Sequence, residues 1–184
     1  TKESDFGQNL GSHEGVWECP DLFSLYENGK EVWVLLVSMN PGGPNKGSAT
    51  QYFLGSFNGK EFTANHTDTR WMDYGPDSYA GVTWSNTGKK RILIGWMSNW
   101  MYANQVPTQK WKNAMTFPRE LSIKQAGGKS YLASRPIEQL ADLRSNKLSL
   151  QRFVISGETD LTEKIQDLKI PFELRLKLDQ RNDF

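Results

Sequence analysis

Two carboxylates near the start of the chain, Glu18 and Asp21, stand inside an apolar and aromatic run where they could do acid–base chemistry. The run covers residues 15–25. Because side chains alternate along a strand, Trp17 and Cys19 are predicted to share one face and Glu18 to lie on the other. A carboxyl buried beside an aromatic ring keeps its proton to a higher pH. A carboxyl that is protonated near neutral pH is what a general acid requires.

Pro20 determines where the strand around Glu18 is interrupted. Proline has no backbone N–H to donate to a neighbouring strand, so the strand should end or bulge directly after Glu18. These residues alone leave a second interpretation open, in which Glu18 is a structural carboxylate paired with a nearby arginine. Asp21 is predicted to be structural, accepting hydrogen bonds from loop amides at the strand end.

The composition argues against several classes of function. With 22 basic and 21 acidic residues the formal net charge is +1, which gives no electrostatic case for binding nucleic acid or an anionic membrane. One cysteine excludes an internal disulfide, and two histidines, His13 and His66, give no metal-ligand spacing. No metal or cofactor is therefore expected. No apolar run approaches the roughly 20 residues of a spanning helix, and residues 1–11 show no signal peptide.

Tryptophan is unusually frequent, with seven residues in a chain of 184. Such a number indicates either a large aromatic core or a surface that binds sugars. The face of an indole ring carries negative quadrupole density, which attracts the polarised C–H edges of a pyranose or furanose ring.

Strand patterns dominate the chain up to residue 123. The predicted strands are 31–39, 49–57, 60–64, 79–84, 91–96 and 115–123. Asn58-Gly59 is a strong hairpin signal between the second and third of them. Short strands separated by turn signals predict an all-β protein. Two successive groups of three or four antiparallel strands favour two propeller blades, and a two-sheet sandwich is the competing interpretation.

The pattern changes after residue 123. Residues 124–150 are predicted to be a linker with a short helix at 136–143, where apolar residues have helical spacing. Residues 151–184 are predicted to begin a second β module, with strands at 151–156 and 171–178. In the latter, alternation places a row of apolar residues on one face, namely Phe172, Leu174, Leu176 and Leu178.

Four segments, in order, resemble the motifs of glycoside hydrolase family 32, which contains invertases, inulinases and levanases. They are Trp17-Glu18-Cys19-Pro20-Asp21, Asp73-Tyr74-Gly75-Pro76-Asp77-Ser78-Tyr79-Ala80, Gly95-Trp96-Met97-Ser98-Asn99-Trp100-Met101-Tyr102 and Pro118-Arg119-Glu120-Leu121. The resemblance runs from about Gly11 to Leu121 and is nearest to the bacterial levanase-like branch.

The resemblance implies a fold and a reaction. The family has a five-bladed β-propeller followed by a β-sandwich, so residues 1–123 would be the last two blades and residues 151–184 the start of the sandwich. Its members hydrolyse β-D-fructofuranosidic bonds in fructans or sucrose with retention, using two carboxyl groups about 5–5.5 Å apart. A fructosyltransferase of the same fold and a non-catalytic fructan-binding fragment are the alternatives.

The resemblance also implies roles for residues. Glu18 matches the general acid/base, Asp77 a residue that binds fructose hydroxyls, and Trp100 an aromatic wall of the same pocket. Trp17 and Cys19 are assigned to substrate binding beside the acid, with Cys19 expected to be a small buried group and not a nucleophile. The structural alternatives are a turn-stabilising Asp77, a Trp100 that packs between blades and a Trp17 that belongs to the core. Trp96 is expected to be core.

Two motifs of the family are missing. The nucleophile of the family lies in a Trp-Met-Asn-Asp-Pro-Asn-Gly segment, and neither this string nor the Arg-Asp-Pro segment of a third carboxylate occurs here. The expected partners are therefore a fructan or sucrose substrate and either N-terminal blades or a second copy covering the exposed blade faces. An extracellular or periplasmic bacterial location is expected, with a cytoplasmic one as the alternative.

Overall fold

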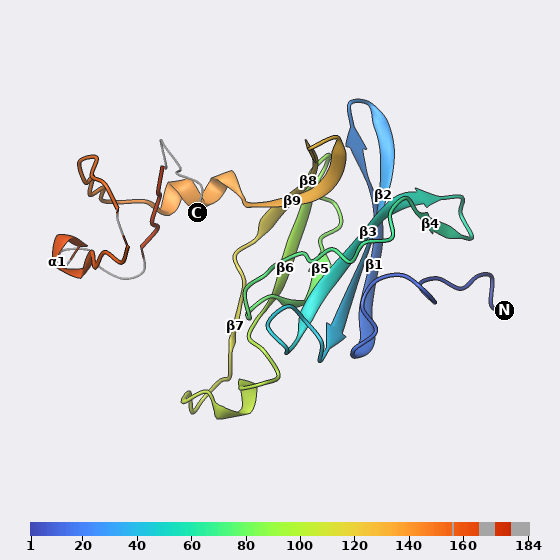
Figure 1. The fold of residues 1–184 in the computed structure, drawn as a ribbon, viewed down its shortest axis with the longest axis horizontal. Helices are drawn as coiled ribbons and strands as arrows, with labels where there is room; N and C mark the ends of the chain where they lie inside the picture. The colour runs from blue at the N-terminus through green and yellow to red at the C-terminus, as the bar shows by residue number, and fades with distance from the viewer. Residues whose placement is uncertain (156, 166–171, 178–184) are drawn as a thin grey trace. The chain divides into compact units, whose positions relative to one another are not determined.

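A computed structural model describes residues 1–155, 157–165 and 172–177 (Figure 1). The chain divides into two compact units, residues 1–138 and 139–184. All strands of the described residues lie in the first unit, where they form two antiparallel sheets. The prediction of a β protein built from two successive groups of strands is confirmed.

The first sheet has the strand order β1-β2-β3-β4. Its strands are β1 (Val16–Glu27), β2 (Lys30–Asn40), β3 (Ala49–Phe57) and β4 (Phe62–Ala64). Glu27 pairs with Lys30, so Asn28 and Gly29 alone connect β1 to β2, and both have positive φ as a type I′ turn requires. The predicted hairpin at Asn58 also forms, with a longer loop in which the Asn58 side chain accepts two backbone N–H groups.

The second sheet has the order β5-β6-β8-β9, with the short β7 paired to β6. Its strands are β5 (Tyr79–Thr83), β6 (Arg91–Met97), β7 (Ala114–Met115), β8 (Arg119–Ala126) and β9 (Lys129–Pro136). The single strand predicted at 115–123 is wrong, because Pro118 separates β7 from β8.

The second sheet continues beyond residue 123, where the sequence pattern suggested a change. β8 pairs with β9 along its whole length, and Gly127 and Gly128 form the turn between them with positive φ at both positions. The first compact unit therefore extends to residue 138. The apolar spacing at 136–143 forms a 3₁₀ helix, Glu138–Leu143 (labelled η2), instead of an α-helix.

The second unit contains one short α-helix, α1 (Thr162–Ile165), within its described residues. The strands predicted at 151–156 and 171–178 are not formed at 151–155 and 172–177, and the remaining residues of those predictions lie outside the described part. An alternating pattern becomes a strand only when another strand satisfies its backbone groups. Nothing in the described part of this unit supplies that partner.

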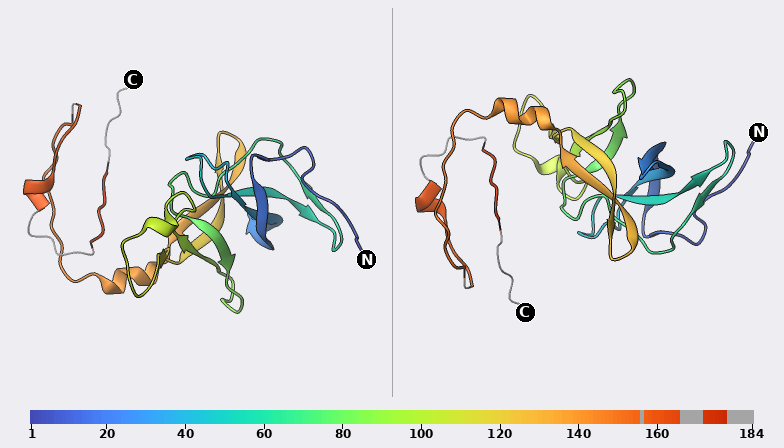
Figure 2. Two further views of the ribbon diagram at one scale, coloured as in Figure 1. Left: turned by 90° about the horizontal axis from the view of Figure 1, so that it is seen from below. Right: turned by 90° about the horizontal axis from the view of Figure 1, so that it is seen from above.

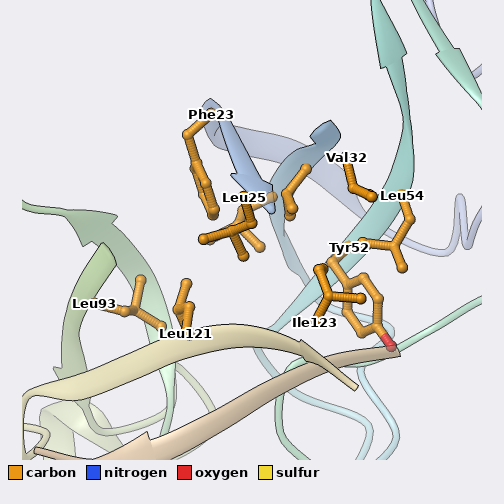
Figure 3. Close-up of a cluster of buried hydrophobic side chains, with 10 residues drawn as sticks. Phe23, Leu25, Val32, Tyr52, Leu54, Leu93, Leu121 and Ile123 are labelled. Atoms are coloured by element: carbon orange, nitrogen blue, oxygen red, sulfur yellow. The ribbon is translucent and has the colours of Figure 1, made fainter. Parts of the chain in front are cut away.

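The two sheets of the first unit pack face to face around an apolar core (Figures 1 and 2). Figure 3 shows Phe23 and Leu25 of β1 pointing toward Leu93 of β6 and Leu121 of β8. Burial of such side chains drives the association of the two sheets. The core thereby fixes β1 against the second sheet, which determines what the carboxylates of β1 can contact.

The opposite face of the first sheet is covered by the N-terminal segment. Phe6 contacts the rings of Phe53 and Phe62 edge to face at 5.0 and 5.1 Å, and Leu10 and Trp17 pack on the same cluster. Trp17 therefore lies on the face of the sheet that is turned away from β5.

Candidate active site

A β-bulge in β1 brings both carboxylates to one face of the first sheet. Glu18 pairs with Ser38 and Asp21 with Leu36, so two residues of β1 stand opposite one residue of β2. Without the extra residue, positions three apart would lie on opposite faces. With it, both carboxylates share the face of Leu36, which is the face turned toward the second sheet. The predicted bulge at Pro20 is confirmed.

Both carboxylates bind β5. The hydroxyl of Tyr79 donates a hydrogen bond to Oε2 of Glu18, and the backbone N–H of Thr83 donates to Oδ2 of Asp21 at 2.8 Å. The predicted structural role of Asp21 is confirmed, although the amide belongs to a strand of the other sheet and not to a local loop. Sequence reasoning missed Tyr79 and Thr83.

The strand β5 carries a bulge of the same kind at the same place. Tyr79 pairs with Trp96 and Val82 with Ile94, and Ala80 has a φ of 49° as Cys19 has a φ of 47°. Bulges redirect side chains and are frequent beside active sites. Here the pair of bulges brings Glu18 and Tyr79, each the residue before its bulge, into contact.

Tyr79 is suited to act as a permanent donor to Glu18. Its side chain is buried, and burial followed by the hydrogen bond to Glu18 raises its pKa well above the ordinary value of 10.0. The phenol therefore stays protonated at neutral pH. Oε2 of Glu18 is engaged, while Oε1 has no partner among the described residues.

Glu18 itself is exposed. The burial beside Trp17 that the sequence suggested is not found, because Trp17 lies on the other face of the sheet. β5 packs against β1 at Glu18 through Tyr79.

A row of aromatic rings leads away from the carboxylate. The rings of Tyr79 and Trp96 have centroids 6.3 Å apart, and those of Trp96 and Trp100 are 5.1 Å apart. Trp96 is half-buried, whereas Trp100 is 52% exposed. The row connects the predicted acid to the predicted sugar-binding ring, and the ring at its end is partly exposed.

Asp77 lies at the edge of a different cavity. The cavity has a volume of about 290 Å³ and is lined by Asp77, Met97, Thr116, Phe117, Arg119, Ser134 and Pro136. Neither Glu18 nor Trp100 contributes to its lining. Oδ1 of Asp77 is buried and has no hydrogen-bond partner among the described residues, so it keeps an acceptor free for a ligand. The prediction that Asp77 binds substrate stays a prediction.

The two remaining predicted residues lie on either side of Glu18. The ring of Trp17 stacks on His13 at 4.8 Å and its Nε1 donates to the carbonyl of Ser12 at 2.7 Å, so its indole is occupied by the N-terminal segment. Cys19 is exposed, and the prediction that it is buried is wrong. At the bulge the backbone of Cys19 adopts a left-handed conformation. Its side chain therefore does not follow the alternation that would point it toward the core.

Within the described residues, no group of three or more His, Cys, Asp or Glu side chains is placed to hold a metal ion. No helix of that part of the chain is long and apolar enough to cross a membrane.

Comparison with known proteins agrees with the motifs around these side chains. Residues 1–136 match the model of the glycosyl hydrolases family 32 N-terminal domain. The chain belongs to this family. It is 42% identical over 164 residues to the levanase of Bacillus subtilis, covering 85% of this chain and 24% of the levanase. It is 40% identical over 154 residues to the extracellular exo-inulinase of Aspergillus niger, covering 77% of this chain and 28% of the inulinase.

Solved structures of family 32 enzymes have the same arrangement of sheets. The exo-inulinase of Aspergillus awamori matches with a TM-score of 0.70 at 38% identity, over 76% of this chain and 29% of that one. A fructofuranosidase of Schwanniomyces occidentalis complexed with fructosylnystose matches with a TM-score of 0.67 at 34% identity, over 73% and 27% of the two chains. The chain thus spans about a quarter of the length of its relatives.

Proposed function

We propose that this chain supplies the general acid/base, Glu18, of a retaining glycosidase that cleaves β-D-fructofuranosidic bonds in fructans or sucrose. The observation that carries the proposal is the carboxylate of Glu18 at the β1 bulge, held at Oε2 by the hydroxyl of Tyr79 in a family 32 chain. Levanases, exo-inulinases and fructofuranosidases are the relatives that support this substrate class.

The reaction has two proton transfers in which Glu18 takes opposite roles. As the bond between the anomeric carbon and the leaving oxygen breaks, protonated Glu18 gives its proton to that oxygen, and a second carboxylate forms a bond to the anomeric carbon. The Glu18 carboxylate then takes a proton from water, whose oxygen displaces the second carboxylate. Because Tyr79 occupies Oε2, Oε1 is the atom that carries the proton.

The nucleophilic carboxylate is proposed to come from a segment outside these 184 residues. The Trp-Met-Asn-Asp-Pro-Asn-Gly string that carries it in the family does not occur here. The separation of about 5–5.5 Å between the two carboxyls of a retaining enzyme would then be set by the packing of that segment near β1.

Substrate contacts are assigned to four further residues. Asp77 would accept hydrogen bonds from fructose hydroxyls through its unpartnered Oδ1, and Trp100 would offer its exposed indole face to a furanose ring. Cys19, exposed beside the acid, would line the entrance to the pocket. Trp17 would shape the pocket from behind the strand by holding the N-terminal segment in place.

The architecture proposed for the complete protein is a five-bladed propeller with a β-sandwich. Residues 1–136 would belong to its last two blades, with the β8–β9 hairpin completing the second of them. Residues 137–150 would lead to the sandwich that begins within 151–184. The missing blades would cover apolar side chains that are exposed in the first unit, among them Val82, Trp84, Met97, Trp111 and Phe117. We propose that the protein acts outside the cytoplasm, as its extracellular relative does.

The experiment is product analysis of the full-length protein and of the 184-residue chain with levan, inulin and sucrose. The full-length protein should release fructose or short fructooligosaccharides. The chain by itself should show no turnover above a buffer control, because catalytic carboxylates act as a unit. Products longer than the substrate would assign a fructosyltransferase instead. Binding of fructan without any turnover by the full-length protein would assign a binding protein, and either result would overturn the proposal.

A further inference from the structure

A buried cluster of Asn99 and Ser48 joins the loops of the two sheets at the end where Glu18 and Trp100 lie. Asn99 follows β6 in the second sheet, and Ser48 precedes β3 in the first. Asn99 is fully buried and Ser48 is 3% exposed. Neither residue was predicted to be functional, and each lies beside a residue or loop that the proposed reaction uses.

The amide of Asn99 uses all of its hydrogen-bonding capacity. Its Nδ2 donates to the carbonyls of Pro76 at 2.9 Å and Ser48 at 3.3 Å. Its Oδ1 accepts from the backbone N–H of Met101 at 3.0 Å and of Ser48 at 3.2 Å. If the amide were flipped, its NH2 group would face the two backbone N–H groups and its oxygen would face the two carbonyls. These four backbone groups therefore fix its orientation. One side chain thus connects three separate stretches of backbone.

Ser48 holds the backbone of Trp100 directly. The N–H of Trp100 donates to Oγ of Ser48 at 3.1 Å, and this Oγ also lies 3.2 Å from Oδ1 of Asn40, at the end of β2. With the N–H of Met101 bound to Asn99, two consecutive amides of the Trp100 loop are tied to the cluster. The indole contacts Trp96, and Trp100 is 52% exposed.

Gly47 shows how closely the two loops approach. A Cβ at this position would lie 2.1 Å from Oδ1 of Asn99, so only glycine fits beside the amide. Ser98, the residue before Asn99, is also buried, and its Oγ donates to Oδ1 of Asn113 at 2.7 Å. Any shift of the cluster would therefore displace the backbone of both loops, the one before β3 and the one after β6.

We propose that Asn99 and Ser48 are positioning residues for substrate binding, which keep the Trp100 indole and the Pro76–Asp77 segment at fixed places. The inference rests on the proposed function and deepens it. A sugar ring stacks on an indole only over a narrow range of distance and angle, so a platform whose backbone is fixed in advance binds more tightly than a mobile one. Both proposed sugar contacts, Trp100 and Asp77, are thus held by a single buried amide and its serine partner.

The test is a double-mutant cycle in the full-length protein with levan as substrate. Ser48→Ala removes the acceptor for the Trp100 N–H, together with the hydroxyl contacts to Oδ1 of Asn40 and Asn99, and keeps the backbone of Ser48 that Asn99 binds. We expect KM to rise about tenfold with kcat within about threefold of the parent. In a Trp100→Ala background the same substitution should leave KM unchanged, because the ring it positions is absent.

Ser130→Ala is the matched control. Oγ of Ser130, in β9, donates to Glu27, in β1, at 2.9 Å, so it also joins the two sheets by a serine hydroxyl, but at their opposite end. It should lower the melting temperature without changing KM. Asn99→Asp, which keeps the acceptor but cannot donate to Pro76, is the second variant and should raise KM in the same way.

The outcomes separate this inference from the proposed function. Levan hydrolysis by the parent, with equal effects of Ser48→Ala with and without Trp100, would show that the cluster is only structural. A KM that stays at the parental value in Ser48→Ala and Asn99→Asp would also overturn the inference. Failure of the parent to hydrolyse any fructan would overturn the proposed function itself.

Discussion

Removing the hydroxyl of Tyr79 should slow the proposed reaction at its acid/base step. Tyr79→Phe keeps the ring and its contact with Trp96 and deletes only the hydrogen bond to Oε2 of Glu18. A hydrogen bond to a charged group contributes roughly 1.5–3 kcal/mol. If all of it were expressed in the transition state, kcat would fall by a factor of about 10–150, since about 1.36 kcal/mol is tenfold.

The lower end of this range is the expected value. Glu18 is exposed in this chain, so water can replace part of the lost donor. We therefore expect kcat on levan to fall about tenfold, less than the 10²–10⁴-fold that general acid catalysis is typically worth.

The assay is steady-state hydrolysis of levan by the full-length protein. Tyr26→Phe is the matched control, because Tyr26 is an exposed residue near the other end of β1 and should leave kcat unchanged. If Tyr79→Phe keeps kcat within about twofold of the parent, Tyr79 does not orient Glu18.

Two further predictions concern stability and association. Nε2 of His66 accepts the backbone N–H of Leu54 at 3.1 Å, and burial followed by Arg70 lowers the pKa of His66 below 6.5. The stability that neutral His66 contributes is present above pH 6.5 and should be lost as the pH falls below it. The melting temperatures at about pH 7.5 and about pH 5.5 should therefore differ less in His66→Gln than in the parent. The control variant His13→Gln should keep the parental difference. Exposed apolar side chains such as Trp84 and Trp111 should make the 184-residue chain self-associate. Light scattering across a dilution series checks this, and a cooperative, monomeric melt at low concentration would contradict it.

The strands of the first unit could be predicted because each carries its own local signal. β2 and β3 are continuous β-branched and aromatic runs, and Asn58-Gly59 predicts the turn between β3 and β4. The bulge after Glu18 could also be predicted, since Pro20 cannot take part in a strand ladder. Two strand predictions were wrong. The single strand predicted at 115–123 is divided at Pro118, and the strands predicted in the second unit have no partner strand among its described residues.

The contacts of the site could not be predicted from the same patterns. That Tyr79 meets Glu18 depends on two bulges, in β1 and β5, and on the packing of two sheets through Leu36 and Leu93. The two bulges and the packing of the sheets depend on residues that are far apart in the chain. They leave no periodic pattern in the sequence near Tyr79. A usable signal was the repeat of a polar residue before a turn-like pair in both sheets, Cys19-Pro20 and Ala80-Gly81.

The same limit applies to Asn99. A buried asparagine that satisfies four backbone groups looks in sequence like any loop asparagine, because its partners, Ser48 and Pro76, are far away along the chain. Only the fold shows that its amide is fully used.

Kinetics of Glu18→Gln in the full-length protein test the central claim most directly. Glutamine keeps the shape of the side chain and can still accept from Tyr79, but it has no transferable proton. We predict that kcat on levan falls by at least about 10²-fold, and that a β-fructofuranoside with a good leaving group suffers much less in its first step, because it needs little protonation. An equal loss of only about tenfold on both substrates would contradict the assignment of Glu18 as the acid.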